Sequence, residues 1–136
     1  MRHAMTKFPH TQNFWYLDQH AVIMNPSLSL EAHITGPAKL NTLMRRDVPI
    51  VPPESVIKTY KHVPAERIQF IITQDKIGMS PGSIIIKSGD WAKYMLDAWY
   101  DPMFRFYNFQ KAETHALVHI SFSYTPYHPP LSFGSV

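Results

Sequence analysis

The chain has no cysteine, no long apolar run and few charged residues, and each shortage limits what it can be. Without cysteine there is no disulfide framework and no thiolate metal site. No stretch approaches the roughly 18 consecutive apolar residues of a membrane-spanning helix. The first residues, which include Arg2, His3 and Lys7, lack the apolar core of a signal peptide. We therefore expect neither a transmembrane segment nor a signal peptide in this sequence.

Charged side chains make up 17% of the 136 residues, with a formal net charge of +3. The basic residues are scattered rather than gathered in a stripe, which argues against nucleic-acid binding. Apolar side chains are plentiful, at 45% of the chain. This content is enough for the core of one small domain.

Apolar strand patterns alternate with helical patterns along the chain. Strands are expected at residues 14–17, 21–24, 67–73 and 83–87, and helices at residues 2–7, 27–34, 38–45, 90–100 and 109–120. Residues 47–64 contain four prolines and indicate an extended crossover. Residues 74–82 are expected to form a polar loop. Strands interleaved with helices favour an α/β fold with a partly parallel sheet.

The segment Trp15-Tyr16-Leu17-Asp18-Gln19-His20 carries the most informative chemistry. An apolar strand ends there at a carboxylate, Asp18. Such a carboxylate can hold a divalent cation against a diphosphate, and hard oxygen ligands suit Mn²⁺ or Mg²⁺. His20 could bind Mn²⁺ through a neutral nitrogen, but it would add no negative charge. The alternative is that Asp18 is an ordinary surface turn residue.

Four blocks of the sequence extend this pattern. They are residues 2–7 leading into 14–18, residues 24–31 with the following His33, residues 71–75, and residues 90–117. In this order they resemble glycosyltransferase family 34, the fungal branch of which includes Golgi mannosyltransferases and galactosyltransferases. The similarity covers roughly residues 1–120 of the chain.

The resemblance implies a fold and an activity. It implies a partial GT-A (Rossmann-like) glycosyltransferase domain at residues 1–120, with a mostly parallel sheet flanked by helices, followed by a divergent, irregular tail at residues 121–136. The intact enzyme would use Mn²⁺ to transfer mannose or galactose from GDP-mannose or UDP-galactose to a glycan, with retention, on the lumenal side of the Golgi membrane. We expect this chain to be a truncated copy, without the first part of the nucleotide-binding sheet.

The resemblance also assigns roles to individual residues. Asp18 and His20 stand at the two metal-binding positions of the family's Asp-x-Asp motif. Gln110 and Glu113 would be catalytic, because polar groups near the anomeric carbon stabilise its developing positive charge. Four further residues are expected to contact sugar or acceptor: Asp75, Ser80, Gly82 and Asn108. Asp75 could equally be a turn residue, and Glu113 could lie on a solvated helix face.

The chain departs from the family pattern at two places. His20 replaces the second aspartate, and Ser80-Pro81-Gly82 replaces the family's Asn-Ala-Gly. The first change removes a negative charge from the metal site, and the second removes a backbone donor. These departures favour a second hypothesis, in which the chain is a catalytically inactive paralogue or gene-model remnant that acts, if at all, as a partner subunit of an active mannosyltransferase.

Overall fold

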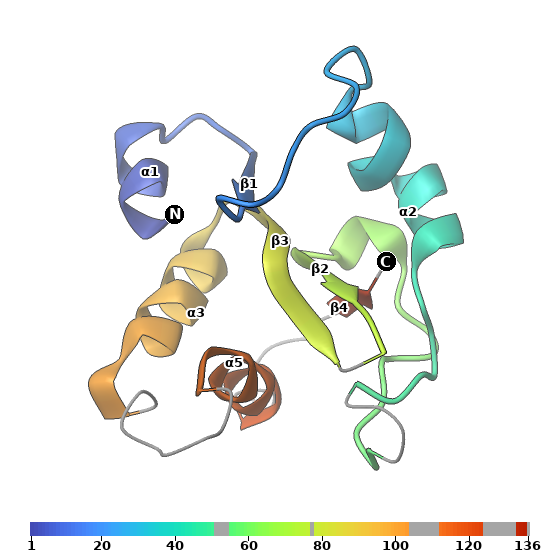
Figure 1. The fold of residues 1–136 in the computed structure, drawn as a ribbon, viewed down its shortest axis with the longest axis vertical. Coiled ribbons are helices and arrows are strands. Elements are labelled where there is room, and N and C mark those ends of the chain that lie inside the picture. Colours follow the sequence, from blue (N-terminus) through green and yellow to red (C-terminus); the bar gives the residue numbers. More distant parts are fainter. Residues whose placement is uncertain (51–54, 77, 104–111, 124–132, 136) are drawn as a thin grey trace.

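The computed structural model describes residues 1–50, 55–76, 78–103, 112–123 and 133–135. These residues form a four-stranded sheet that lies between two groups of helices (Figure 1). The fold is therefore mixed α and β, as the alternation of patterns predicts. No helix in these ranges is long and apolar enough to cross a bilayer.

The sheet has the strand order β1-β3-β2-β4. Its members are β1 (Asn13–Leu17), β2 (Phe70–Gln74), β3 (Met79–Lys87) and β4 (Phe133–Ser135). β3 pairs antiparallel with both β1 and β2, and β2 pairs in parallel with β4. The expectation of a mostly parallel sheet is thus wrong for the described strands. β2 and β3 are antiparallel because the connection between them, at residues 75–78, suits a hairpin but is too short for a parallel crossover.

Two further expectations about strands need correction. Residues 21–24 are not a strand, although they are apolar, and they lie exposed after the turn at Asp18. The loop expected at residues 74–82 is shorter, because β2 continues through Gln74 and β3 already begins at Met79. The buried Met79 side chain explains this early start, since it packs in the core beneath the sheet.

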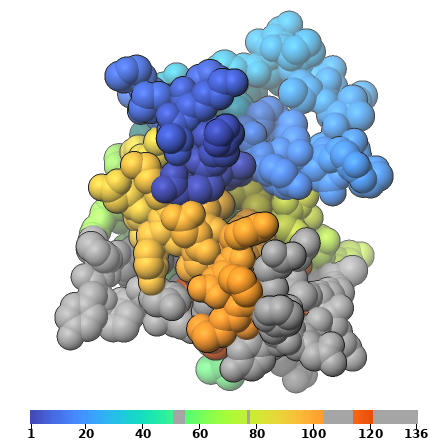
Figure 2. Space-filling view, turned by 90° about the vertical axis from the view of Figure 1, so that its left-hand side faces the viewer, coloured from blue at the N-terminus to red at the C-terminus, as the bar shows by residue number. Residues whose placement is uncertain are grey.

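One face of the sheet is covered by α1 (Arg2–Lys7), α3 (Asp90–Tyr100) and α5 (Ala112–Ser123). The alternation of β3 places Ile84 and Ile86 on this face, where they join Phe70, Ile72 and other buried residues in the larger core cluster. Figure 2 shows α1, in dark blue, lying against α3, in gold and orange. The helices expected at residues 2–7 and 90–100 are confirmed.

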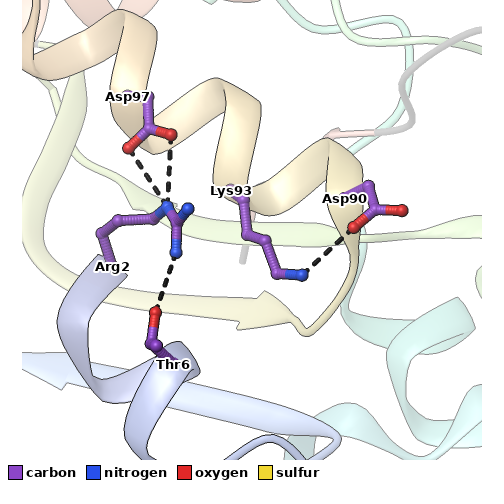
Figure 3. A network of polar contacts seen from close by, with 5 residues as sticks. All are labelled: Arg2, Thr6, Asp90, Lys93 and Asp97. Atoms are coloured by element: carbon purple, nitrogen blue, oxygen red, sulfur yellow. Dashed lines mark hydrogen bonds and ion pairs between the residues drawn. The ribbon is translucent and has the colours of Figure 1, made fainter.

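α1 is attached to α3 by polar and apolar contacts. Arg2 Nε lies 3.1 Å from Asp97 Oδ1 and 3.2 Å from Asp97 Oδ2, and Arg2 Nη1 donates a hydrogen bond to Thr6 Oγ1 (Figure 3). Both ionic side chains are about half exposed to solvent, so this pair adds little to stability. Met5, which is 2% exposed in the core, provides the main anchor of α1.

The opposite face carries a π-helical turn η1 (Glu31–Thr35), α2 (Pro37–Leu43) and a 3₁₀ turn η2 (Ala65–Arg67). Ile71 and Ile85 of the sheet pack there with Leu40, Ala65 and Ile68. At the start of η1, Ser29 Oγ accepts a 3.2 Å hydrogen bond from the Ala32 amide.

The last part of the chain contains regular structure within the tail that was expected to be irregular. α5 continues to Ser123, and β4 adds a short parallel strand beside β2 at residues 133–135. Residues 124–132 lie outside the described part of the chain. The described pieces of residues 121–136 are therefore helix and strand.

Candidate functional site

Asp18 lies directly after β1, where the chain leaves the sheet. Its amide donates a 2.8 Å hydrogen bond to the Gly82 carbonyl of β3. Its carboxylate Oδ1 accepts a 2.8 Å hydrogen bond from the His20 amide, and its carbonyl accepts one from the Ala21 amide. Aspartate favours turns because its side chain can bond the backbone two residues on. Asp18 is therefore a turn residue, and the turn holds its half-buried carboxylate in a defined orientation.

A bulge in β3 lies beside this carboxylate. Ser80 and Ile84 of β3 pair with consecutive residues of β2, so residues 81–83 have no register partner on that strand. A proline is tolerated in a bulge because the ladder needs no donor there. The bulge explains how Pro81 can stand inside a strand.

The bulge brings three predicted site residues together. A Cβ built on Gly82 would lie 3.7 Å from Asp18 Cβ, 4.0 Å from Asp18 Oδ2 and 3.9 Å from Ser80 Oγ. Because Gly82 has no side chain, a space at least the size of a methyl group lies beside Oδ2. No residue in the described part of the chain donates a hydrogen bond to Oδ2. This oxygen is available to a ligand.

His20 is exposed, and its Nε2 lies 3.2 Å from the Gln19 side-chain nitrogen. Within the described ranges, no three His, Cys, Asp or Glu side chains gather closely enough to hold a metal ion. The protein ligands of a cation here would be Asp18 and, two residues on, His20. One carboxylate with phosphate oxygens and water is a donor set that suits a hard divalent cation, so these residues fit one.

Asp75 lies in the hairpin turn between β2 and β3, at the same end of the sheet as Asp18. Its amide donates to the Gly78 carbonyl, and its Oδ1 accepts from the Gly78 amide at 3.0 Å. Gly78 has φ 138°, a conformation that favours glycine. Asp75 therefore closes the turn, as the alternative interpretation predicts, and a contact with sugar remains a prediction.

The remaining predicted residues cannot be placed in this site. Asn108 and Gln110 lie outside the described residues, and Glu113 belongs to α5 while its side chain is not described. Their roles stay predictions.

The sequence interpretation missed two polar contacts on the bulge. Trp15 Nε1 donates to Ser83 Oγ at 3.1 Å, and Thr73 Oγ1 donates to the Ser80 carbonyl at 3.3 Å. Both donors lie in strands that the sequence predicts, at residues 14–17 and 67–73. Pro81, which the sequence predicts to lie in a loop, is the available signal, because a proline inside a strand marks an edge or a bulge.

A cavity of about 370 Å³ lies at the other end of the sheet, between β1, α2 and η2. Its charged lining residues are Glu31, Glu66 and Lys87, and its floor includes Leu40 and Ile85. None of the predicted site residues lines it, so it is separate from the Asp18 site.

Comparison with known proteins establishes the family. The family model of the galactosyl transferase GMA12/MNN10 family matches residues 1–128. A Schizosaccharomyces pombe protein described as an uncharacterized alpha-1,2-galactosyltransferase is 35% identical over 120 residues, which are 88% of this chain and 37% of that protein. The probable alpha-1,6-mannosyltransferase MNN10 of Saccharomyces cerevisiae is 38% identical over 104 residues, which are 76% of this chain and 26% of that protein.

A third relative, an alpha-1,2-galactosyltransferase of Schizosaccharomyces pombe, is 29% identical over 133 residues, or 95% of this chain and 34% of that protein. The chain belongs to the GMA12/MNN10 family, which confirms the resemblance to glycosyltransferase family 34. It spans about a third of the length of the curated relatives it matches. No solved structure matches it, and the GT-A fold remains a prediction.

Proposed function

We propose that this chain forms the cation-holding part of a hexosyltransferase site. The full reaction would move mannose or galactose from GDP-mannose or UDP-galactose to a glycan acceptor, with retention of configuration. The observation that supports it best is the placement of the Asp18 carboxylate beside the side-chain-free space at Gly82. The relatives named as galactosyltransferases and mannosyltransferases support the same reaction class.

A divalent cation such as Mn²⁺, when bound, neutralises the diphosphate and stabilises the departing charge. Asp18 would hold it through Oδ2, since Oδ1 already accepts the His20 amide. The imidazole of His20 could supply a nitrogen ligand, although it contributes no charge. Gly82 leaves room for the ligand next to Oδ2, and Ser80 Oγ lies at the border of that space.

The other assignments complete this proposal. Asp75 and Asn108 would contact sugar or acceptor beside Ser80 and Gly82, and Gln110 and Glu113 would stabilise charge at the anomeric carbon. The place of action would be the lumenal side of the Golgi membrane. Because the chain spans about a third of its relatives, the complete site would need parts of the longer protein.

A second candidate function is that of an inactive partner subunit of an active mannosyltransferase. The specific observation in its favour is His20. Its amide is used in the turn on Asp18, and its ring lies against Gln19 where the family has a carboxylate. With one negative charge less, the site would hold a dication more weakly.

Direct titration of the full chain with Mn²⁺ tests the proposal. Asp18→Asn keeps the size and the acceptor oxygen for the His20 amide but removes the charge. We expect saturable Mn²⁺ binding that Asp18→Asn abolishes and that the matched turn variant Asp75→Asn leaves unchanged. Binding that survives Asp18→Asn, or equal losses in both variants, would contradict the assignment of Asp18.

A further inference from the structure

The β3 bulge is tied to both neighbouring strands by side chains. From β1, the Trp15 indole donates to Ser83 Oγ at the end of the bulge. From β2, the Thr73 hydroxyl donates to the Ser80 carbonyl at its beginning. Between these two contacts, the Gly82 carbonyl accepts the Asp18 amide at 2.8 Å. The segment beside the Asp18 carboxylate is thus fixed at three points.

These contacts replace hydrogen bonds that the bulge disrupts. Residues 81–83 have no register partner on β2, and Pro81 has no N–H to donate. A bulged segment without partners on β2 has fewer restraints, and on the side of β1 it is held by the Leu17–Ser83 pair and the Asp18 amide. Trp15 adds a restraint on this side, because it belongs to the same strand whose end carries Asp18.

The exposure of Trp15 supports such a role. Its side chain lies on the α2 face of the sheet, opposite Ile85, yet the residue is 37% exposed. Burial of apolar surface therefore contributes less to the role of Trp15 than it does for a residue of the core. The indole N–H of Trp15 donates a hydrogen bond to Ser83 Oγ, and this specific bond is the contribution that burial does not explain.

We propose that Trp15 and Thr73 are positioning residues for the Asp18 site. They hold the bulge where the Gly82 carbonyl meets the Asp18 amide, and this fixes the carboxylate for cation binding. Trp15 acts through Ser83, and Thr73 acts through the Ser80 carbonyl. The inference rests on the proposed function only in taking Asp18 as a cation ligand.

The test uses the full chain with Trp15→Phe, Ser83→Ala and the double variant. Residue-resolved hydrogen exchange measures the Asp18 amide, Mn²⁺ titration measures the affinity, and thermal unfolding measures stability. Each single variant should speed exchange at Asp18 and weaken Mn²⁺ binding by about twofold to tenfold, the worth of one hydrogen bond. The double variant should lose no more than either single variant, because both remove the same bond.

Four further variants serve as controls for this test. Trp91→Phe removes an indole N–H from α3, away from the bulge, and should leave both Asp18 readouts unchanged. Ser83→Thr keeps the hydroxyl and should retain the wild-type affinity. Thr73→Val should act like Ser83→Ala, whereas Ser80→Ala should leave exchange at Asp18 unchanged, since Thr73 bonds the Ser80 main chain.

Unchanged exchange at Asp18 in Trp15→Phe and Ser83→Ala would overturn the proposal. The proposal would also be overturned if the losses of Mn²⁺ affinity in the two single variants added up in the double variant and simply paralleled the fall in unfolding temperature. If the wild-type chain binds no Mn²⁺, the cation role of Asp18 fails, and the exchange measurements still decide whether the two side chains position the bulge.

Discussion

The Asp18 amide and the Gly82 carbonyl are joined by a 2.8 Å hydrogen bond that connects the end of β1 to the bulge of β3. This bond brings a charged residue next to a residue without a side chain. The absence of a side chain at Gly82 leaves a space beside Asp18 Oδ2, and in the proposed site the cation would bind there. Glycine at this position is therefore expected to matter for binding more than for folding.

Gly82→Ala should test that distinction. A Cβ there would stand 3.7 Å from Asp18 Cβ, an ordinary contact distance, so the fold should survive. The methyl group would occupy the space beside Oδ2 that a bound cation would need, so Mn²⁺ affinity should fall by about tenfold or more, which is about 1.4 kcal/mol or more. Gly89→Ala is the matched control, because its Cβ would meet no atom within 4 Å. Equal affinities of the two variants would count against a ligand beside Gly82.

The edge of the sheet at β1 should drive self-association. Among the described strands, β1 pairs with β3 alone, and it contains no charge and no proline. Unprotected apolar edges of this kind promote aggregation. We expect the chain expressed alone to be poorly soluble, and Tyr16→Lys, at a residue 46% exposed, to reduce association measured by light scattering.

Val56→Lys is the control for that experiment. Val56 is 95% exposed but lies in the crossover, away from β1. If it improves solubility as much as Tyr16→Lys, the gain comes from added charge. A soluble wild-type monomer with a cooperative thermal transition would contradict the expectation altogether.

The larger core should depend strongly on β3. Ile86 is 0% exposed and packs between the sheet and α3. Ile86→Ala should lower the free energy of unfolding by about 2–5 kcal/mol, because it leaves a cavity. Ile57→Ala, at a residue 41% exposed, should cost much less in the same denaturant titration. Similar losses of stability in Ile86→Ala and Ile57→Ala would contradict the central position of Ile86 in the core.

The chain alone should show no transfer from GDP-mannose or UDP-galactose. It offers one carboxylate at the cation position and spans about a third of its relatives. A radiochemical assay with Mn²⁺ and a mannoside acceptor measures this. Robust transfer by the purified chain, lost in Asp18→Ala, would refute the expectation and establish an active enzyme.

Local patterns predicted much of this fold. The helix at residues 90–100 follows from its acidic first turn and from the proline at 102, and both signals lie within two residues of the helix. The antiparallel pairing of β3 with β1 and β2 differs from the prediction, because both the alternation of strands with helices and the resemblance favour parallel strands, whereas the short β2–β3 connection allows only a hairpin. The segment Ser80-Pro81-Gly82, predicted as loop, belongs to β3, because the pairing that forms this strand depends on residues far away in sequence.

The candidate site shows the same limit. Asp18 was found because a carboxylate at a strand end is a local signal. Its proximity to Ser80 and Gly82 was expected only through the resemblance, and the structure supplies the contact. Trp15 and Thr73 escaped notice because their polar atoms act across strands, which no period in the sequence reveals.

The most direct test of the central claim is a chimera. Residues 14–34 of this chain replace the matching segment of an active relative, such as the alpha-1,2-galactosyltransferase of Schizosaccharomyces pombe, and the transfer rate is measured across Mn²⁺ concentrations. If Asp18 holds the cation and His20 lacks the second charge, the chimera should be about 10²–10³-fold slower. His20→Asp should restore much of that rate, and Asp18→Ala should abolish it. A chimera that equals its parent, or one that Asp18→Ala leaves active, would contradict the account.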